Sequence, residues 1–172
     1  MSKFVITQDI QEKQPLIFQD VEVEIEHLKT GDYSIKGYHD RFTVEHKTIK
    51  DLIGTCDHNK VKGKKDSNYA RFKRELARMR ATFDFYAIVI SGYPKEMLPE
   101  CYRIAAMQSE AGYKKIVAPI ARFNGVIGSL KGLRVDYNCH FYFEGTKEWA
   151  AEWIVDQATY FLRHIKTIKI KN

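Results

Sequence analysis

Alternation of apolar and polar residues predicts extended strands in the first half of the chain. Within residues 20–27, valine and isoleucine alternate with glutamate, and residues 41–47 alternate in a similar way. Successive side chains of a strand point to opposite faces, so each run has two chemically distinct faces. Further strands are expected at residues 3–8 and 33–35, the second of them after the turn signal Thr30-Gly31-Asp32.

Helical spacing of apolar residues dominates the second half. A stripe of Tyr69, Phe72, Leu76 and Met79 predicts a helix that begins at Asn68. The other expected elements are a short helix over 49–55 capped by Thr48, strands at 84–91 and 139–143, and helices over 99–112, 119–133 and 146–165. Strands followed by helices that alternate with strands indicate a mixed α/β sandwich.

The composition is typical of one folded domain. The chain has 172 residues, of which 44% are hydrophobic, so a real core is expected and disorder of the whole chain is excluded. Its longest apolar runs are far shorter than the roughly 20 residues of a membrane span, and no signal peptide is recognisable. We therefore expect an intracellular, cytoplasmic protein without a membrane partner. Three widely spaced cysteines without a CxxC motif indicate neither a disulfide framework nor a zinc site.

The charge distribution points to a polyanionic partner. There are 28 Lys and Arg residues against 22 Asp and Glu, a net charge of +6, and residues 60–80 alone carry nine basic and two acidic residues. Residues 57–67 are expected to form a flexible basic loop within the domain. The residues expected to contact DNA phosphates are Arg71, Arg74, Arg78, Lys60, Lys62, Lys64 and Lys65. A solvated surface without a ligand is the alternative for these side chains.

Three residues form a candidate site for phosphodiester chemistry. Glu45 and Lys47 are two positions apart on an expected strand and so share a face, and the turn at Asp32 leads into the neighbouring strand. Two converging carboxylates make an oxygen site suited to Mg²⁺ or Mn²⁺, and a lysine beside them can position a water molecule. The bare pattern is common by chance, so a solvated strand face remains the alternative.

The motifs around these residues resemble the XPF-type structure-specific nuclease domain, a branch of the PD-(D/E)XK nucleases. The closest similarities are Gly31-Asp32-Tyr33 and Val44-Glu45-His46-Lys47, with Asp51 four residues further on. Weaker similarities are Asp9-Ile10-Gln11-Glu12, the segment Ala70-Arg71-Phe72-Lys73-Arg74-Glu75, and Pro119 through Gly128-Ser129-Leu130. Together they extend over most of residues 4–165.

The resemblance implies an α/β fold, a restriction-endonuclease-like mixed central sheet flanked by helices, with residues 1–172 as one nuclease domain. It implies a Mg²⁺-dependent endodeoxyribonuclease, with Mn²⁺ as a substitute and no nucleotide cofactor, acting on branched, flapped or otherwise structured DNA. Asp32 and Glu45 would be metal ligands together with the backbone carbonyl of His46. Lys47 would position the attacking water, and Asp9, Glu12 and Asp51 would be supporting acidic residues. Arg71 is the motif arginine expected near this site.

Three departures from the family pattern keep a second function open. Gln11 and His46 replace arginines, and Ser91 replaces a glutamate whose loss would weaken a second metal position. The alternative is a catalytically inactive nuclease-like module that binds DNA or protein, and a third reading is an interaction domain without a metal. Family members usually dimerise, so the resemblance leaves a homodimer open, and they carry a helix-hairpin-helix domain that these residues do not include. Such a small form would suit phage or bacterial DNA metabolism.

Overall fold

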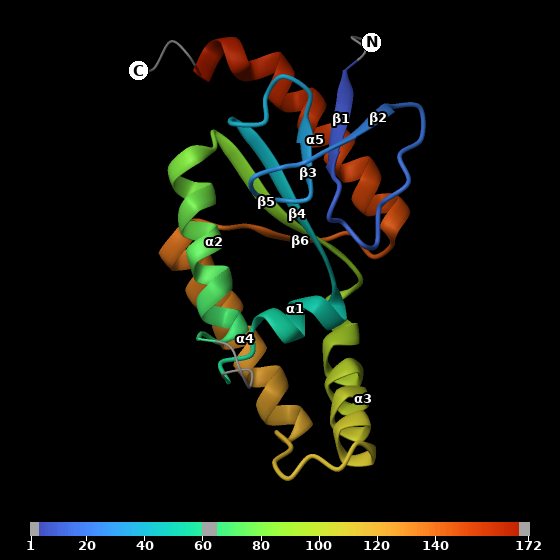
Figure 1. Cartoon of the computed structure of the whole chain (residues 1–172), viewed down its shortest axis with the longest axis vertical. Coiled ribbons are helices and arrows are strands. Elements are labelled where there is room, and N and C mark those ends of the chain that lie inside the picture. The colour runs from blue at the N-terminus through green and yellow to red at the C-terminus, as the bar shows by residue number, and fades with distance from the viewer. Residues whose placement is uncertain (1–3, 60–64, 169–172) are drawn as a thin grey trace.

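A six-stranded mixed sheet forms the centre of the molecule (Figure 1). The computed structural model describes residues 4–59 and 65–168. The strand order is β2-β1-β3-β4-β5-β6. The strands are β1 (Val5–Asp9), β2 (Glu22–Glu26), β3 (Tyr33–Ile35), β4 (Phe42–Thr48), β5 (Phe85–Ser91) and β6 (Phe141–Phe143).

The middle of the sheet combines antiparallel and parallel pairs. β3 is antiparallel to both β1 and β4, whereas β2 pairs in parallel with β1, and β4, β5 and β6 are parallel to one another. The predicted turn at residues 30–32 directly precedes β3, and residues 36–41 connect β3 and β4 into an antiparallel hairpin. It brings the residue before β3 beside the second half of β4.

The helices are α1 (Ile49–Thr55), α2 (Asn68–Thr82), α3 (Met97–Glu110), α4 (Pro119–Tyr137) and α5 (Lys147–Ile168), with a 3₁₀ turn at Pro94–Glu96. As predicted, the Thr48 side chain caps α1 by accepting a hydrogen bond from the Asp51 N–H. The predicted end of α4 at residue 133 is four residues too early, and the predicted strand 139–143 is confined to β6. α4 ends only where Asn138 adopts a left-handed conformation with φ of 50°.

In the described part of the chain, α5 is the helix that covers one face of the sheet, together with Leu16 of the β1–β2 connection. The buried alanine, isoleucine and phenylalanine side chains of α5 pack against apolar residues of β1, β3, β4 and β5. The members of this cluster from the sheet are Ile6, Tyr33, Ile35, Phe42, Val44 and Val89. Phe42 and Val44 are therefore on the α5 face, as the alternation along β4 predicts.

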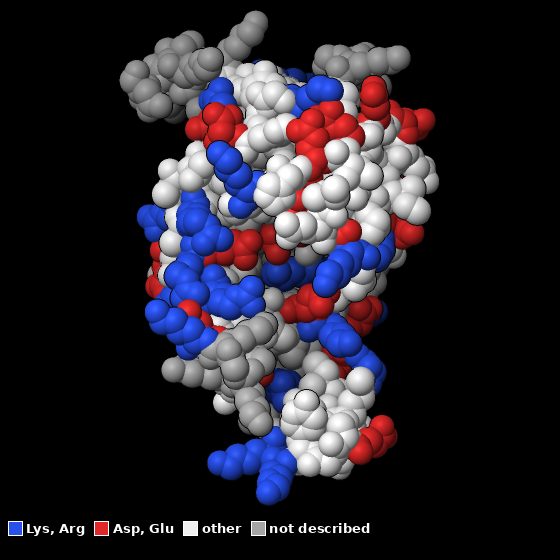
Figure 2. Space-filling view, in the orientation of Figure 1, with Lys and Arg blue, Asp and Glu red and all other residues white. Residues whose placement is uncertain are grey.

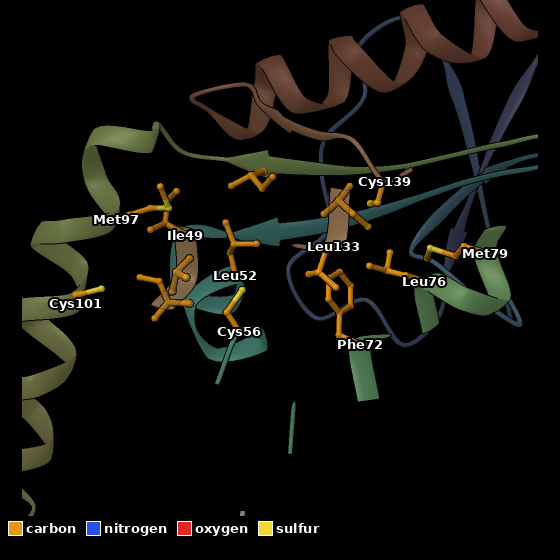
Figure 3. Close-up of a cluster of buried hydrophobic side chains, with 14 residues drawn as sticks. Ile49, Leu52, Cys56, Phe72, Leu76, Met79, Met97, Cys101, Leu133 and Cys139 are labelled. Atoms are coloured by element: carbon orange, nitrogen blue, oxygen red, sulfur yellow. The ribbon is translucent and has the colours of Figure 1, made fainter. Parts of the chain in front are cut away.

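The opposite face is covered by α1, α2, α3 and α4, but only in part. Their cluster, shown in Figure 3, receives Ile88 and Ile90 from β5, and no residue of β1, β2 or β3 belongs to it. In that uncovered region the buried side chains are polar. Thr7 donates a hydrogen bond to Glu24, and Ser34 donates one to the Phe42 carbonyl. The sheet therefore has a polar area beside the helices.

The sequence also led to expectations about the cysteines, about membrane-spanning segments and about the basic loop. Cys56, Cys101 and Cys139 are buried free thiols, in agreement with the absence of a disulfide framework. Among the described residues, no helix is both long and apolar enough to cross a membrane. Lys60, Lys62 and Lys64 of the predicted basic loop lie outside the described residues.

The turn before β3 requires glycine at position 31. Gly31 has φ of 80°, and a Cβ there would overlap with the Thr43 hydroxyl and lie 3.2 Å from the Val44 carbonyl oxygen. The turn is fixed on both sides, because the Asp32 N–H donates to the Val44 carbonyl and the Asp9 N–H donates to the Asp32 carbonyl. Asp32 is thus held rigidly beside β4.

We expect Gly31→Ala to destabilise the protein by about 2–4 kcal/mol, because a left-handed conformation and a steric overlap add together. Gly37→Ala is the matched control. Gly37 has the same φ of 80°, but no atom lies within 4 Å of its Cβ position. This control should lose only about 1–2 kcal/mol in urea unfolding. Equal losses in the two variants would show that the contact with Thr43 is unimportant.

Candidate active site

Glu45 and Lys47 form an ion pair on the face of β4 that points toward α2. The Lys47 Nζ atom lies 2.8 Å from Glu45 Oε1, and the side chains are only 11% and 13% exposed, respectively. The same ammonium group lies 4.9 Å from the centre of the Phe72 ring on α2. The shared face was predicted from the alternation along the strand, and the structure confirms that geometry.

Asp32 joins this pair from the neighbouring turn. Its Oδ2 atom accepts a hydrogen bond of 2.8 Å from the backbone N–H of His46, the residue between Glu45 and Lys47. The structure therefore brings Asp32, Glu45 and Lys47 together, although they come from two separate segments. The bond to β4 fixes the carboxyl group of Asp32 next to the pair.

Burial and neighbouring charges together shift the pKa values of these residues. Burial raises the pKa of Asp32 to about 9, and the charge of Glu45 acts in the same direction. Burial alone would lower the pKa of Lys47. The carboxylates of Glu45, Glu75 and Asp32 outweigh this effect and raise the lysine pKa. Lys47 is therefore a cation among carboxyl groups that partly resist ionisation.

Glu75 on α2 is a further acidic residue at this site; it is the last residue of the family-like segment 70–75, but no role was predicted for it. Burial, and next the charge of Glu45, raise its pKa to about 7, while Lys47, Arg78 and Arg71 act in the opposite direction. One signal was available. Glu75 is adjacent to Leu76 of the predicted apolar stripe, so it borders the buried face of an otherwise basic helix.

The three expected supporting acidic residues differ in their surroundings. Asp9 accepts a hydrogen bond of 3.1 Å from the Leu28 N–H, and Asp51 bonds with the capping residue Thr48. These two carboxylates thus stabilise local backbone structure. The charge of Glu12 contributes to the raised pKa of Asp32, so Glu12 is the one whose field reaches the Asp32 carboxyl group.

Two of the departures from the family pattern contact each other on the opposite face of β4. The His46 ring nitrogen Nε2 lies 2.9 Å from the Ser91 hydroxyl, and parallel pairing sets His46 beside Val89 of the α5 core. Burial, with a smaller effect of Lys147, lowers the pKa of His46 to about 4. Ser91 therefore points away from Glu45 and Lys47. The expected weakening of a second metal position by Ser91 has no basis in this geometry.

Basic side chains line the α2 border of the site. Arg71 and Arg78 are exposed, and both act on Glu75, which lies between them on one face of the helix. Arg74 is paired with Asp66 at 2.9 Å, and Lys65 is exposed. Figure 2 shows the Lys and Arg side chains gathered over α2 at the left of this view.

A second group of possible metal ligands lies on the acidic edge of the sheet. One ligand atom each of Glu24, Glu26 and His39 lies within 4.8 Å of the others. Glu24 already accepts hydrogen bonds from Thr7 and Lys36. This group contains none of Asp32, Glu45 and Lys47, and the charge of its Glu24 is already paired with that of Lys36.

The buried carboxyl of Asp32 should reduce the stability of the metal-free protein. Its pKa is raised on folding, so the unfavourable contribution grows as the pH rises from about 4 to about 9. We expect Asp32→Asn to raise the melting temperature in EDTA by several degrees, at about 2–4 °C per kcal/mol. The gain should be larger at about pH 8 than at about pH 5.

Glu26→Gln is the control for this experiment, because it removes the same charge at an exposed position. Differential scanning calorimetry of both variants should show a pH-dependent gain for Asp32→Asn only. A lower melting temperature for Asp32→Asn at both pH values would mean that its carboxylate stabilises the fold.

Comparisons with known proteins agree with the family resemblance. The model of the ERCC4 domain family matches residues 5–156, whereas no curated protein matches the chain. Solved structures of XPF from Aeropyrum pernix and of the same protein in complex with DNA match with TM-scores of 0.61 and 0.63, each at 17% identity. The matches cover 91% and 94% of this chain, which spans 60% and 66% of those chains. Together the matches establish the restriction-endonuclease-like fold predicted from the sequence, and the chain belongs to the ERCC4 domain family, with an XPF-type nuclease domain.

Proposed function

We propose that this protein is a metal-dependent DNA endonuclease that hydrolyses phosphodiester bonds in branched, flapped or otherwise structured DNA. The observation that carries the proposal is the buried group of Asp32, Glu45 and Lys47 beside the basic helix α2. Family membership and the similar fold of an XPF protein in complex with DNA support the same function. Because that XPF protein is longer than this chain, its activity and substrates are carried over here as proposals.

The residues present fit a divalent cation. Asp32 and Glu45 offer oxygen ligands in a place where burial raises the pKa of one of them to about 9. A positive charge in addition to that of Lys47 would stabilise the ionised form of such a carboxyl group. We assign Asp32, Glu45 and the backbone carbonyl of His46 as ligands of Mg²⁺, with Mn²⁺ as a substitute. The ion would supply Lewis-acid activation of the phosphodiester bond.

Lys47 is assigned to the positioning of the attacking water and the scissile phosphate. Its ammonium group is held by Glu45 and by the face of Phe72, so its position is restricted before any substrate binds. The raised pKa keeps the group cationic, which favours the negative charge that develops at the phosphate. Glu75 contributes to this raised pKa, and we assign it to the support of Lys47. Of the three predicted supporting acidic residues, Glu12 is assigned to the support of the Asp32 carboxyl group, whereas Asp9 and Asp51 are assigned to the support of the backbone around the site.

Arg71 and Arg78 are assigned to the phosphates that flank the cleaved bond. Both are exposed and lie at the α2 border of the site, on the same helix face as Glu75. Arg74 is neutralised by Asp66, so its contribution should be smaller. Lys65, Lys60, Lys62 and Lys64 complete the proposed phosphate contacts, three of them outside the described residues.

We also propose that the protein forms a homodimer. Trp149 and Tyr160 on α5 are 52% and 63% exposed, and they are eleven positions apart, which is close to three helical turns. They therefore share one outer face of α5, where large apolar side chains favour contact with a second copy. Light scattering should give the mass of a dimer, and the double variant Trp149→Glu/Tyr160→Glu should be monomeric. A monomeric wild-type protein would contradict this proposal.

Cleavage of labelled flap, junction, duplex and single-stranded DNA with Mg²⁺, Mn²⁺ or EDTA tests the proposed activity. We expect metal-dependent cutting that Asp32→Ala, Glu45→Ala and Lys47→Ala each reduce by at least about 100-fold. Glu26→Ala is the matched control from the other acidic group and should cut as the wild type does. If wild type and variants are equally inert but bind DNA, the protein is the inactive binding module instead.

A further inference from the structure

The connection between α3 and α4 is an outlying surface on the side of the molecule that carries the site. Residues 111–118 are all exposed. α3 begins beside the end of β4, where Thr48, Ile49 and Pro99 line one hollow, and its 14 residues extend about 20 Å away from it. Figure 1 shows this connection at the lower end of the molecule. We call residues 107–120 the hairpin tip.

The backbone at both ends of the hairpin tip is fixed. Gly112 ends α3 with φ of 71°, and its N–H donates to the Ser109 carbonyl at 3.0 Å. The next N–H, of Tyr113, donates to the Gln108 carbonyl, also at 3.0 Å, which completes a Schellman motif. Pro119 begins α4 with a restricted φ. The points at which the tip leaves α3 and enters α4 are therefore defined by the backbone itself.

The hairpin tip combines apolar surface with positive charge. Five large apolar side chains are strongly exposed there: Tyr113 at 60%, Ile120 at 58%, Met107 at 48%, and Ile116 and Val117 at 39% each. Such a cluster, unlike single exposed residues, is typical of an interaction surface.

The positive charge of the tip lies within this apolar surface. Lys114 and Lys115 stand in its middle, and residues 111–122 contain no acidic residue. Neither lysine takes part in a salt bridge within the described part of the chain. The matching ligand is anionic and also presents apolar faces. Nucleic acid with unstacked bases has both properties.

We propose that the hairpin tip binds the unpaired or branched part of a DNA substrate. This inference rests on the proposed function and adds a second contact region to it. Lys114 and Lys115 contact phosphates, while Tyr113 and Ile116 contact base faces that are hidden in a duplex and exposed at a branch. The separation of about 20 Å corresponds to about six base pairs, so one substrate can reach both regions. Selectivity for structured DNA would then arise in part within this domain.

Fluorescence anisotropy in EDTA tests the proposal without cleavage, with a duplex and a splayed-arm DNA of the same sequence as probes. We expect Lys114→Glu/Lys115→Glu to weaken binding of both probes by roughly tenfold and to lower the salt slope by about 2. Tyr113→Ser/Ile116→Ser should weaken binding of the splayed-arm probe several-fold and leave duplex binding unchanged. Lys13→Glu/Lys36→Glu is the charge-matched control, at exposed positions in the β1–β2 and β3–β4 connections and away from the proposed dimer face of α5.

The outcomes separate this inference from the proposed function. If the wild type binds and cuts DNA but the hairpin-tip variants bind both probes as the control does, the tip inference is wrong and the proposed function stands. If the wild type binds neither probe, the proposed function fails as well. Equal weakening of both probes by Tyr113→Ser/Ile116→Ser would contradict the contact with unpaired bases. Circular dichroism spectra of all variants establish that they are folded.

Discussion

The burial of several carboxyl groups around a single ammonium group is the constraint on which the site depends. Burial alone would lower the pKa of Lys47, and the neighbouring carboxylates outweigh this effect and raise the pKa. Burial, and next the charge of Glu45, raise the pKa values of Asp32 and Glu75 to about 9 and about 7, and Lys47 does not offset this rise. A second positive charge would relieve this repulsion. The metal-free protein therefore stores unfavourable electrostatic energy at one place, as is typical of functional sites.

β4 makes this arrangement possible because its two faces have different surroundings: one carries the acidic site, and the other packs against α5. Glu45 and Lys47 point toward α2, whereas the His46 side chain is buried on the α5 face and contacts Ser91. The backbone N–H of His46 nevertheless holds Asp32 in place. Any side chain that fits the α5 face can therefore occupy position 46 without removing the bond that positions Asp32. This explains how a departure from the family motif leaves the acidic group intact.

The sequence predicted the elements whose periodicity is strong, and it predicted the residues of the site that lie within such elements. β4 and α2 follow directly from alternation and from an apolar stripe, and Asp32 follows from a turn signal with a family motif. The end of α4 at Tyr137 was missed because a left-handed Asn138 sets it. The contact between His46 and Ser91 depends on which elements pack together, and that information is tertiary. For Glu75 the sequence offered a signal in its position beside the apolar stripe of α2, but its proximity to Lys47 is also tertiary.

The distribution of charge around the site indicates from which side a polyanion would approach, which the net charge of +6 alone does not. β2 is the edge strand on one side of the site and carries Glu22, Glu24 and Glu26, whereas exposed Arg71 and Arg78 lie on α2 at the other side. A polyanion that approaches the site is therefore repelled from the β2 edge and attracted to α2. A phosphate chain is negatively charged along its whole length, so the uneven charge of the protein surface must determine where the chain lies. The strand order thus fixes the direction of approach as well as the position of the carboxylates.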